Sequence, residues 1–185
     1  MTPTEQLKTE HEAIKLMLRV LDEVSARLDA GQPVPPQHLN QITEFIQVFA
    51  DRCHHGKEED LLFPAMEEVG IPREGGPIGV MLAEHDIGRN FVRGMREGVA
   101  RYEAGDRRAG SQIADNARGY VNLLRQHIQK EDDILYMMAD MHLSSQKQEQ
   151  LLEQFEKVEQ ERIGPGKHEE FHELLHRLRD VYLKE

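Results

Sequence analysis

Two segments on either side of the middle of the chain carry similar sequences. Residues 54–63 read HHGKEEDLLF, and residues 127–136 read HIQKEDDILY. A shorter phrase recurs at almost the same separation, as EHE around His11 and EHD around His85. Because self-similarity of this kind indicates a duplicated structural unit, we expect two similar halves. Each half would pair one segment that bears the short phrase with one that bears the long phrase.

The apolar residues of these segments have a helical period. They recur at steps of three and four residues, which places them on one face of a helix, and no alternation typical of a strand occurs. The first predicted helix starts at a capping box that opens with Thr2, and Pro64 interrupts or bends the second. Breaks rich in Gly and Pro at residues 30–36 and 70–77 separate the helices. The pattern predicts an all-α fold with four core helices.

The C-terminal part of the chain is predicted to be an addition to this core. Leu151 and Phe155 share one face of a fifth helix, and the phrase IGPGK at 163–167 ends that helix. A short sixth helix follows. We therefore divide the chain into a four-helix core at residues 1–143 and a helical extension at 144–185 that packs on it.

Composition excludes several classes of partner. The 34 acidic and 23 basic residues among 185 give a net charge of −11, and no basic tract stands out, so nucleic acid is not an expected partner. No apolar run is long enough to cross a membrane, and the N-terminus lacks the pattern of a secretion signal. Cys53 is the only cysteine, so a disulfide within the chain is excluded. These features favour a cytoplasmic protein and leave its oligomeric state open.

The long repeated phrase contains a histidine with a glutamate four residues later. Residues i and i+4 share a helix face, so His54 with Glu58, and His127 with Glu131, can point into the helical core together. One such pair is more often a surface ion pair than a metal site. The repetition of the whole phrase is not explained in that way, and a buried glutamate is costly unless it is paired or bound to a metal.

With one inward histidine from each of the other two helices, these pairs predict a dinuclear metal site. The predicted ligands are His11, His54, Glu58, His85, His127 and Glu131. We assign the first two histidines to one metal and the last two to the other, with both glutamates and a hydroxide or oxo group as bridges. Nitrogen and carboxylate ligands without thiolate favour Fe or Mn, and Zn would also fit. One coordination position would remain open for a small ligand.

The doubled histidine of the first long phrase leaves two registers open. The alternative to His54 is His55, which has Glu59 four residues later, and a helical wheel centred on the preceding aromatic residues favours this second register. The repeat favours His54, because His55 aligns with Ile128, which cannot bind a metal. We give more weight to the repeat, since a wheel drifts along a helix and bundle helices often contain bulges.

These motifs resemble the hemerythrin-like family, also known as the cation-binding HHE domain. The phrase TEH matches the family's first-helix histidine, HHGKEEDLLFP its second helix, EHD its third and HIQKEDD its fourth. The resemblance covers about residues 4 to 140. It implies an up-down four-helix bundle that holds a non-haem di-iron site, with the six predicted ligands in the family's ligand positions.

One position departs from the oxygen-carrying members of that family. Those proteins have a second histidine on the third helix, four residues from the first, where this chain has Met81 or Arg89. The candidates to fill the position are His55, Glu59, Glu84 and, in the extension, His168, which is alternatively a lid. A site poorer in nitrogen favours ferric iron, so we expect the reduced protein to be oxidised by air rather than to carry oxygen reversibly.

The predicted function is a di-iron protein that binds or reacts with a small molecule. Dioxygen, nitric oxide and peroxide are the candidate ligands, and the resemblance places the protein in iron handling or in the oxidative or nitrosative stress response. Two alternatives remain: an enzyme that disproportionates peroxide at the open position, and a metal-sensing module whose C-terminal helices bind a partner. The sequence does not separate binding from turnover.

Overall fold

The computed structural model describes residues 1–184, and this part of the chain is helical and contains no strand. The prediction of an all-α fold is therefore confirmed. The core elements are α1 (Pro3–Asp29), α2 (Pro36–Phe45), the π-helical η1 (Ile46–His55) and η2 (Glu58–Leu62), α3 (Phe63–Glu68), α4 (Pro77–Glu103), α5 (Ala109–Lys130), the π-helical η3 (Glu131–Leu135) and α6 (Tyr136–His142). The remaining elements are α7 (Ser145–Val158), the π-helical η4 (Glu159–Ile163) and α8 (Lys167–Tyr182). None of the described helices combines the length and apolarity needed to cross a membrane.

Local sequence signals explain where several helices begin and end. The Thr2 side chain accepts a hydrogen bond from the backbone N–H of Glu5, and the Glu5 side chain accepts one from the backbone N–H of Thr2, so the predicted capping box starts α1. Pro64 does not end the second helical segment, because it lies in the first turn of α3, where a missing N–H costs least. Gly164 and Gly166 adopt positive φ angles of 99° and 76°, which interrupt the helical backbone between η4 and α8.

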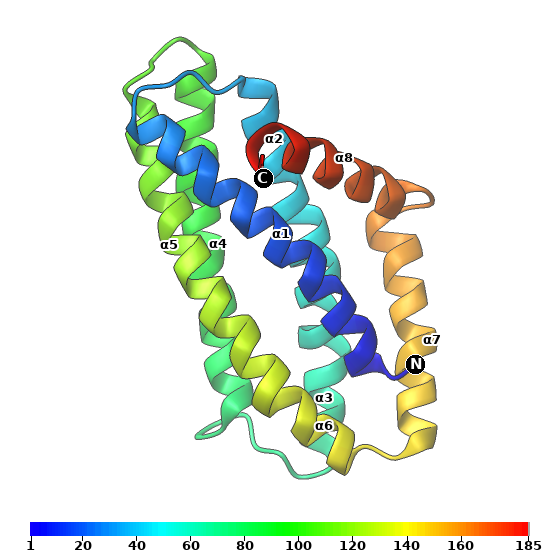
Figure 1. Ribbon diagram of the computed structural model, residues 1–185. Helices are drawn as coiled ribbons and strands as arrows, with labels where there is room; N and C mark the ends of the chain where they lie inside the picture. Colours follow the sequence, from blue (N-terminus) through cyan, green and yellow to red (C-terminus); the bar gives the residue numbers. More distant parts are fainter. Residues whose placement is uncertain (185) are drawn as a thin grey trace.

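Neighbouring helices pack along their lengths in the order α1, α5, α4 and α2 (Figure 1). The continuous segment from α2 to α3 also contacts α1, through η1. The C-terminal elements cover this side of the molecule: α7 packs on α1 and η2, η4 packs on η1, and α8 lies across α1 and α2. The C-terminal helices therefore lie against the segment that carries the doubled histidine.

A belt of buried polar residues separates two apolar cores. Along α1, Leu7 belongs to the smaller core, His11 to the polar belt and Ile14 to the larger core. Three other parts of the chain pass from one core to the other in the same way: the segment from α2 to α3, the helix α4 and the segment from α5 to α6. Each of these contributes a histidine to the belt at the level where the cores meet, which places the repeated phrases at one site.

Candidate metal centre

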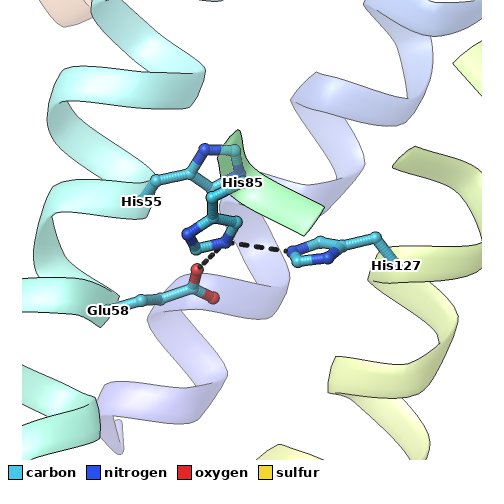
Figure 2. Close-up of side chains that lie close together, drawn as sticks. All are labelled: His55, Glu58, His85 and His127. Atoms are coloured by element: carbon cyan, nitrogen blue, oxygen red, sulfur yellow. Dashed lines mark hydrogen bonds and ion pairs between the residues drawn. The ribbon is translucent and has the colours of Figure 1, made fainter. Parts of the chain in front are cut away.

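Buried histidine and glutamate side chains form two groups in this belt, and each group can hold a cation. The first cluster consists of His11, His54, Glu58 and Glu131, and the second cluster of His55, Glu58, His85 and His127. Within each cluster, one ligand atom from every residue lies within 4.8 Å of the others, and no member is more than 5% exposed. Figure 2 shows the second cluster, whose side chains converge from η1, η2, α4 and α5.

Both glutamates reach histidines of both clusters. Glu131 has one oxygen 3.0 Å from Nε2 of His11 and the other 2.8 Å from Nε2 of His127. Glu58 lies in the same way between the remaining pair, 3.5 Å from Nε2 of His54 and 3.2 Å from Nε2 of His85. Each carboxylate thus directs its two oxygens toward different clusters, which is the arrangement that a bridging ligand requires.

A second set of carboxylates fixes the orientation of every histidine in the two clusters. The Nδ1 atoms face an outer carboxylate in the pairs His11–Asp132 (2.7 Å), His54–Glu10 (3.0 Å), His55–Asp51 (3.3 Å), His85–Glu59 (3.0 Å) and His127–Glu84 (3.1 Å). An ionised carboxylate only accepts hydrogen bonds, so Nδ1 carries the proton in each pair. The Nε2 lone pair is then directed at the centre, as in the carboxylate–histidine–metal arrangements of known metal sites.

The innermost polar atoms lack partners of their own. His54 Nε2, Glu58 Oε2 and Glu131 Oε1 are buried and form no hydrogen bond among the described residues, although other ligand atoms lie close to them. In the second cluster, Nε2 of His85 lies 3.1 Å from Nε2 of His127, so two lone pairs face each other when both rings are neutral with the proton on Nδ1. Close, buried lone pairs of this kind require a proton or a cation between them. The donor set of imidazole and carboxylate fits iron, manganese or zinc.

Electrostatics keep the two bridging carboxylates and His55 in the form that binds a cation. Burial and the charge of Glu131 raise the pKa of Glu58, but His54 and His85 outweigh both and hold that pKa at about 2. For Glu131, nearby histidines likewise outweigh burial and hold its pKa well below the usual range. Burial, together with the nearby His85, lowers the pKa of His55 to about 4. At neutral pH the two carboxylates are therefore ionised and His55 is a neutral imidazole.

π-Helical turns explain why both members of the doubled histidine belong to the site. At the end of η1, the N–H of Gly56 donates to the carbonyl of Asp51, five residues back. Such a turn holds more residues than an α-turn, so neighbouring side chains are separated by a smaller angle and His54 and His55 both face inward. The sequence posed these two histidines as alternatives, whereas the structure places one in each cluster.

The sequence model of the hemerythrin HHE cation-binding domain matches residues 2–139 of this chain. The chain belongs to this family. Uncharacterized proteins of Mycobacterium tuberculosis and Mycobacterium bovis are each 26% identical to it over 163 residues, which is 88% of this chain. The match spans 63% of the length of these curated relatives. No solved structure matches the chain significantly.

The structure brings together all six residues that the sequence selected as ligands in this HHE domain, together with His55, which the sequence offered as the alternative register and as a candidate for the missing position. Glu59 and Glu84 lie one layer further out, where they hold His85 and His127. His168 lies outside both clusters: its ring packs on Phe49 at 5.2 Å and its Nε2 lies 2.9 Å from Nε2 of His172. Its position is set by the packing of α8 on the larger core, to which Phe49 belongs. The spacing of residues along the sequence did not reveal this packing.

Arg89 occupies one of the positions where oxygen carriers of this family would have their further histidine. Its guanidinium donates to Asp51 at 2.9 Å and to Glu59 at 2.9 Å, the outer carboxylates of His55 and His85. The other position, Met81, belongs to the smaller apolar core. The expected shortage of nitrogen is therefore not found, because His55 supplies an imidazole from η1 and Arg89 supports it from α4.

Tyr136 is a member of the site that the sequence analysis missed. Its hydroxyl donates to Glu58 Oε1 and lies 3.4 Å from Glu131 Oε2, and its ring stacks on His11 with 5.4 Å between ring centroids. Phe63 takes the equivalent place in the other half, with its ring parallel to His85 at 6.2 Å. The change from Phe to Tyr within an otherwise repeated phrase was the signal that could have identified this hydroxyl.

We expect Tyr136→Phe to lower the free energy of unfolding by about 1.5–3 kcal/mol, because it deletes a buried hydrogen bond to a charged acceptor. Burial and the two carboxylates raise the pKa of Tyr136 well above its usual value, so its hydroxyl keeps the proton that it donates. Tyr120→Phe is the matched control, since the Tyr120 hydroxyl has no hydrogen-bond partner among the described residues and should change stability by less than about 0.5 kcal/mol. Urea denaturation of both variants measures the difference in the free energy of unfolding. An equal decrease in both variants would contradict the role of the Tyr136 hydroxyl as a hydrogen-bond donor to Glu58.

The second cluster lines a cavity. A cavity of about 200 Å³ is lined by His55, His85 and His127, with Tyr120 and Arg93 further along its wall. In the part of the chain that the structure describes, no member of the first cluster lines this cavity, and each of its four residues is 0% exposed. The two clusters are therefore unequal: the first is enclosed by protein, and the second can be reached by a small molecule.

Proposed function

We propose that this HHE domain holds two iron ions, one in each cluster, and that dioxygen, nitric oxide or peroxide binds or reacts at the second. The observation that carries the proposal is the pair of clusters that share Glu58, of which the second lines a cavity, whereas the described residues of the first do not line it. Iron held there would supply the electrons that such small molecules accept or exchange. The family match supports cation binding by this domain.

The surroundings of the two clusters differ, which supports different roles for them. His11 and His54 lie in the enclosed first cluster with the hydroxyl of Tyr136, so water and reactants have little access to them. His55, His85 and His127 form one wall of the cavity, so a molecule that enters meets three imidazoles held by outer carboxylates. The second cluster is therefore the reactive position of the proposal, and the first has a supporting role.

We interpret the architecture as an up-down four-helix bundle at residues 1–143 with a two-helix extension at 144–185. The pseudo-symmetric contacts of the repeated phrases support this division, since each half uses the same residue types for the same contacts. His54 is held by Glu10, and His127 is held by Glu84. The duplication of one helical hairpin accounts for both the bundle and the paired metal ligands.

Metal analysis tests the first part of this proposal. Protein from iron-supplemented cells, purified without oxygen, should contain two iron ions per chain, because each cluster provides its own histidines and both share carboxylates. Inductively coupled plasma mass spectrometry on freshly purified protein measures the ratio. One zinc per chain with no iron would overturn the di-iron assignment.

Stopped-flow spectroscopy tests the second part. The reduced protein should change its absorption on mixing with dioxygen, nitric oxide or peroxide, and His55→Ala should lose that change because it removes an imidazole at the cavity. The expected oxidation by air rests on a site with few imidazoles; if His55 serves as a ligand, that argument for irreversible oxidation is weaker. A spectrum that stays constant with all three reactants would refute small-molecule chemistry at this site.

A further inference from the structure

Lys57 is a buried charge that the ligand sets do not use. Its side chain is 0% exposed, and its ammonium group donates to Glu10 Oε2 and to Glu159 Oε1, both at 2.8 Å. The ring of Phe155 lies 5.6 Å from the ammonium nitrogen. A buried ammonium is costly unless it is fully paired, so each of these partners matters to its position.

This lysine connects a ligand of the first cluster to the C-terminal helices. The second oxygen of Glu10 lies 3.0 Å from Nδ1 of His54, so one continuous chain of polar contacts runs from His54 through Glu10 and Lys57 to Glu159. Glu159 is the first residue of η4 and lies beyond the part of the chain that matches the HHE family. Glu159, which lies outside the family domain, thus helps to hold Lys57 and, through Glu10, the His54 ring inside the domain.

The other half of the repeat lacks this connection. Lys130 aligns with Lys57 and contacts Glu84, which holds His127. Its side chain is 39% exposed, and none of the described carboxylates of the C-terminal helices forms an ion pair with it. The contact with η4 is therefore an addition to one half only. It is not a by-product of the duplicated hairpin.

A second contact holds η4 on the segment that carries the ligands. The Arg162 guanidinium forms an ion pair with Asp60 and lies over Gly56, where a Cβ atom would clash with it. Gly56 directly follows His55, and Asp60 lies in η2 with Glu58. The position of η4 is thus tied to both π-helical stretches that hold ligands.

We propose that Glu159 and Lys57 are positioning residues for His54, so that the metal affinity of the first cluster and the docking of the α7–η4 segment depend on each other. The inference rests on the proposed two-metal function. A carboxylate at Glu159 holds Lys57, Lys57 holds Glu10, and Glu10 fixes the ring of His54. Coupling between binding and docking is reciprocal, so metal in the first cluster stabilises the docked segment to the same extent.

Substitution of Glu159 in the full chain tests the coupling. Glu159→Gln should weaken Fe(II) binding at one of two sites by up to about tenfold, less than the roughly 10–100-fold typical of losing a direct outer partner of a ligand, because Glu159 acts on His54 through Lys57 and Glu10. Glu161→Gln is the matched control, because it removes the same charge from an exposed neighbour on η4. Anaerobic titration with Fe(II) against a competing chelator measures both affinities, and Glu159→Asp should restore part of the loss.

Hydrogen exchange tests the reciprocal effect, first in the wild-type protein and then in the two variants. In wild-type protein, Fe(II) should slow amide exchange across residues 145–163, and Glu159→Gln should reduce that protection while Glu161→Gln keeps it. The inference is overturned if Glu159→Gln binds Fe(II) at both sites with wild-type affinity. It is also overturned if Fe(II) does not change the amide exchange rates of residues 145–163 in the wild-type protein. Failure of the wild-type protein to bind two Fe(II) ions would instead refute the proposed function, so the two failures are distinguishable.

Discussion

Replacing His55 with alanine is expected to reduce the metal content from two ions per chain to about one. His55 is a neutral, buried imidazole in the second cluster, and its Nδ1 is held by Asp51. Loss of an outer partner typically weakens metal binding by roughly 10–100-fold, and loss of a ligand itself should cost more. Metal analysis after gel filtration in a weak chelator measures the ratio.

The companion variant His54→Ala should lose the ion of the first cluster instead. Both variants would then hold about one ion, but only His55→Ala should abolish the reaction with small molecules, because the cavity adjoins the second cluster. His176→Ala, an exposed histidine of α8, is the control and should keep two ions. Two ions bound at wild-type affinity in His55→Ala would show that His55 packs in the site without serving as a ligand.

Removal of metal should lower the melting temperature by on the order of 10 °C or more. Each unpaired buried polar group costs about 1–3 kcal/mol, and His54 Nε2, Glu58 Oε2 and Glu131 Oε1 are such groups. Binding at 1,000 times the Kd stabilises the native state by about 4 kcal/mol per site. For a chain of this size, 1 kcal/mol corresponds to about 2–4 °C in Tm.

Differential scanning calorimetry with and without a strong chelator measures this shift. The variant Glu58→Ala supplies an independent check, because it removes the carboxylate that the two clusters share and should make Tm nearly insensitive to the chelator. Glu59→Ala should keep most of the response, since Glu59 contacts His85 from the outer layer. Equal melting temperatures for the wild-type protein in both conditions would exclude a structural contribution from metal.

Local sequence determined the helices and most of the residues at the site. Helical periodicity depends on which side chains must be buried, and capping at Thr2 depends on residues three apart, so both are readable along the chain. The repeat added long-range information, because it showed which histidines occupy equivalent positions. It also favoured His54 over His55 as a single choice, a restriction that the structure does not share.

Only the tertiary structure decided the arrangement around those residues. A π-helical turn at η1 is set by how the segment packs, so a wheel of constant period could not place both His54 and His55 inside. Some contacts between a histidine and its outer carboxylate join the two halves of the repeat, such as the contact of Asp132 with His11. The two residues of such a pair lie far apart in the sequence, so the sequence gives no sign of the contact. The contact from Lys57 to Glu159 joins the HHE domain to a helix outside it. Sequence determined which side chains could bind a metal, and packing decided which of them meet, because contacts between distant segments depend on how whole helices lie against one another.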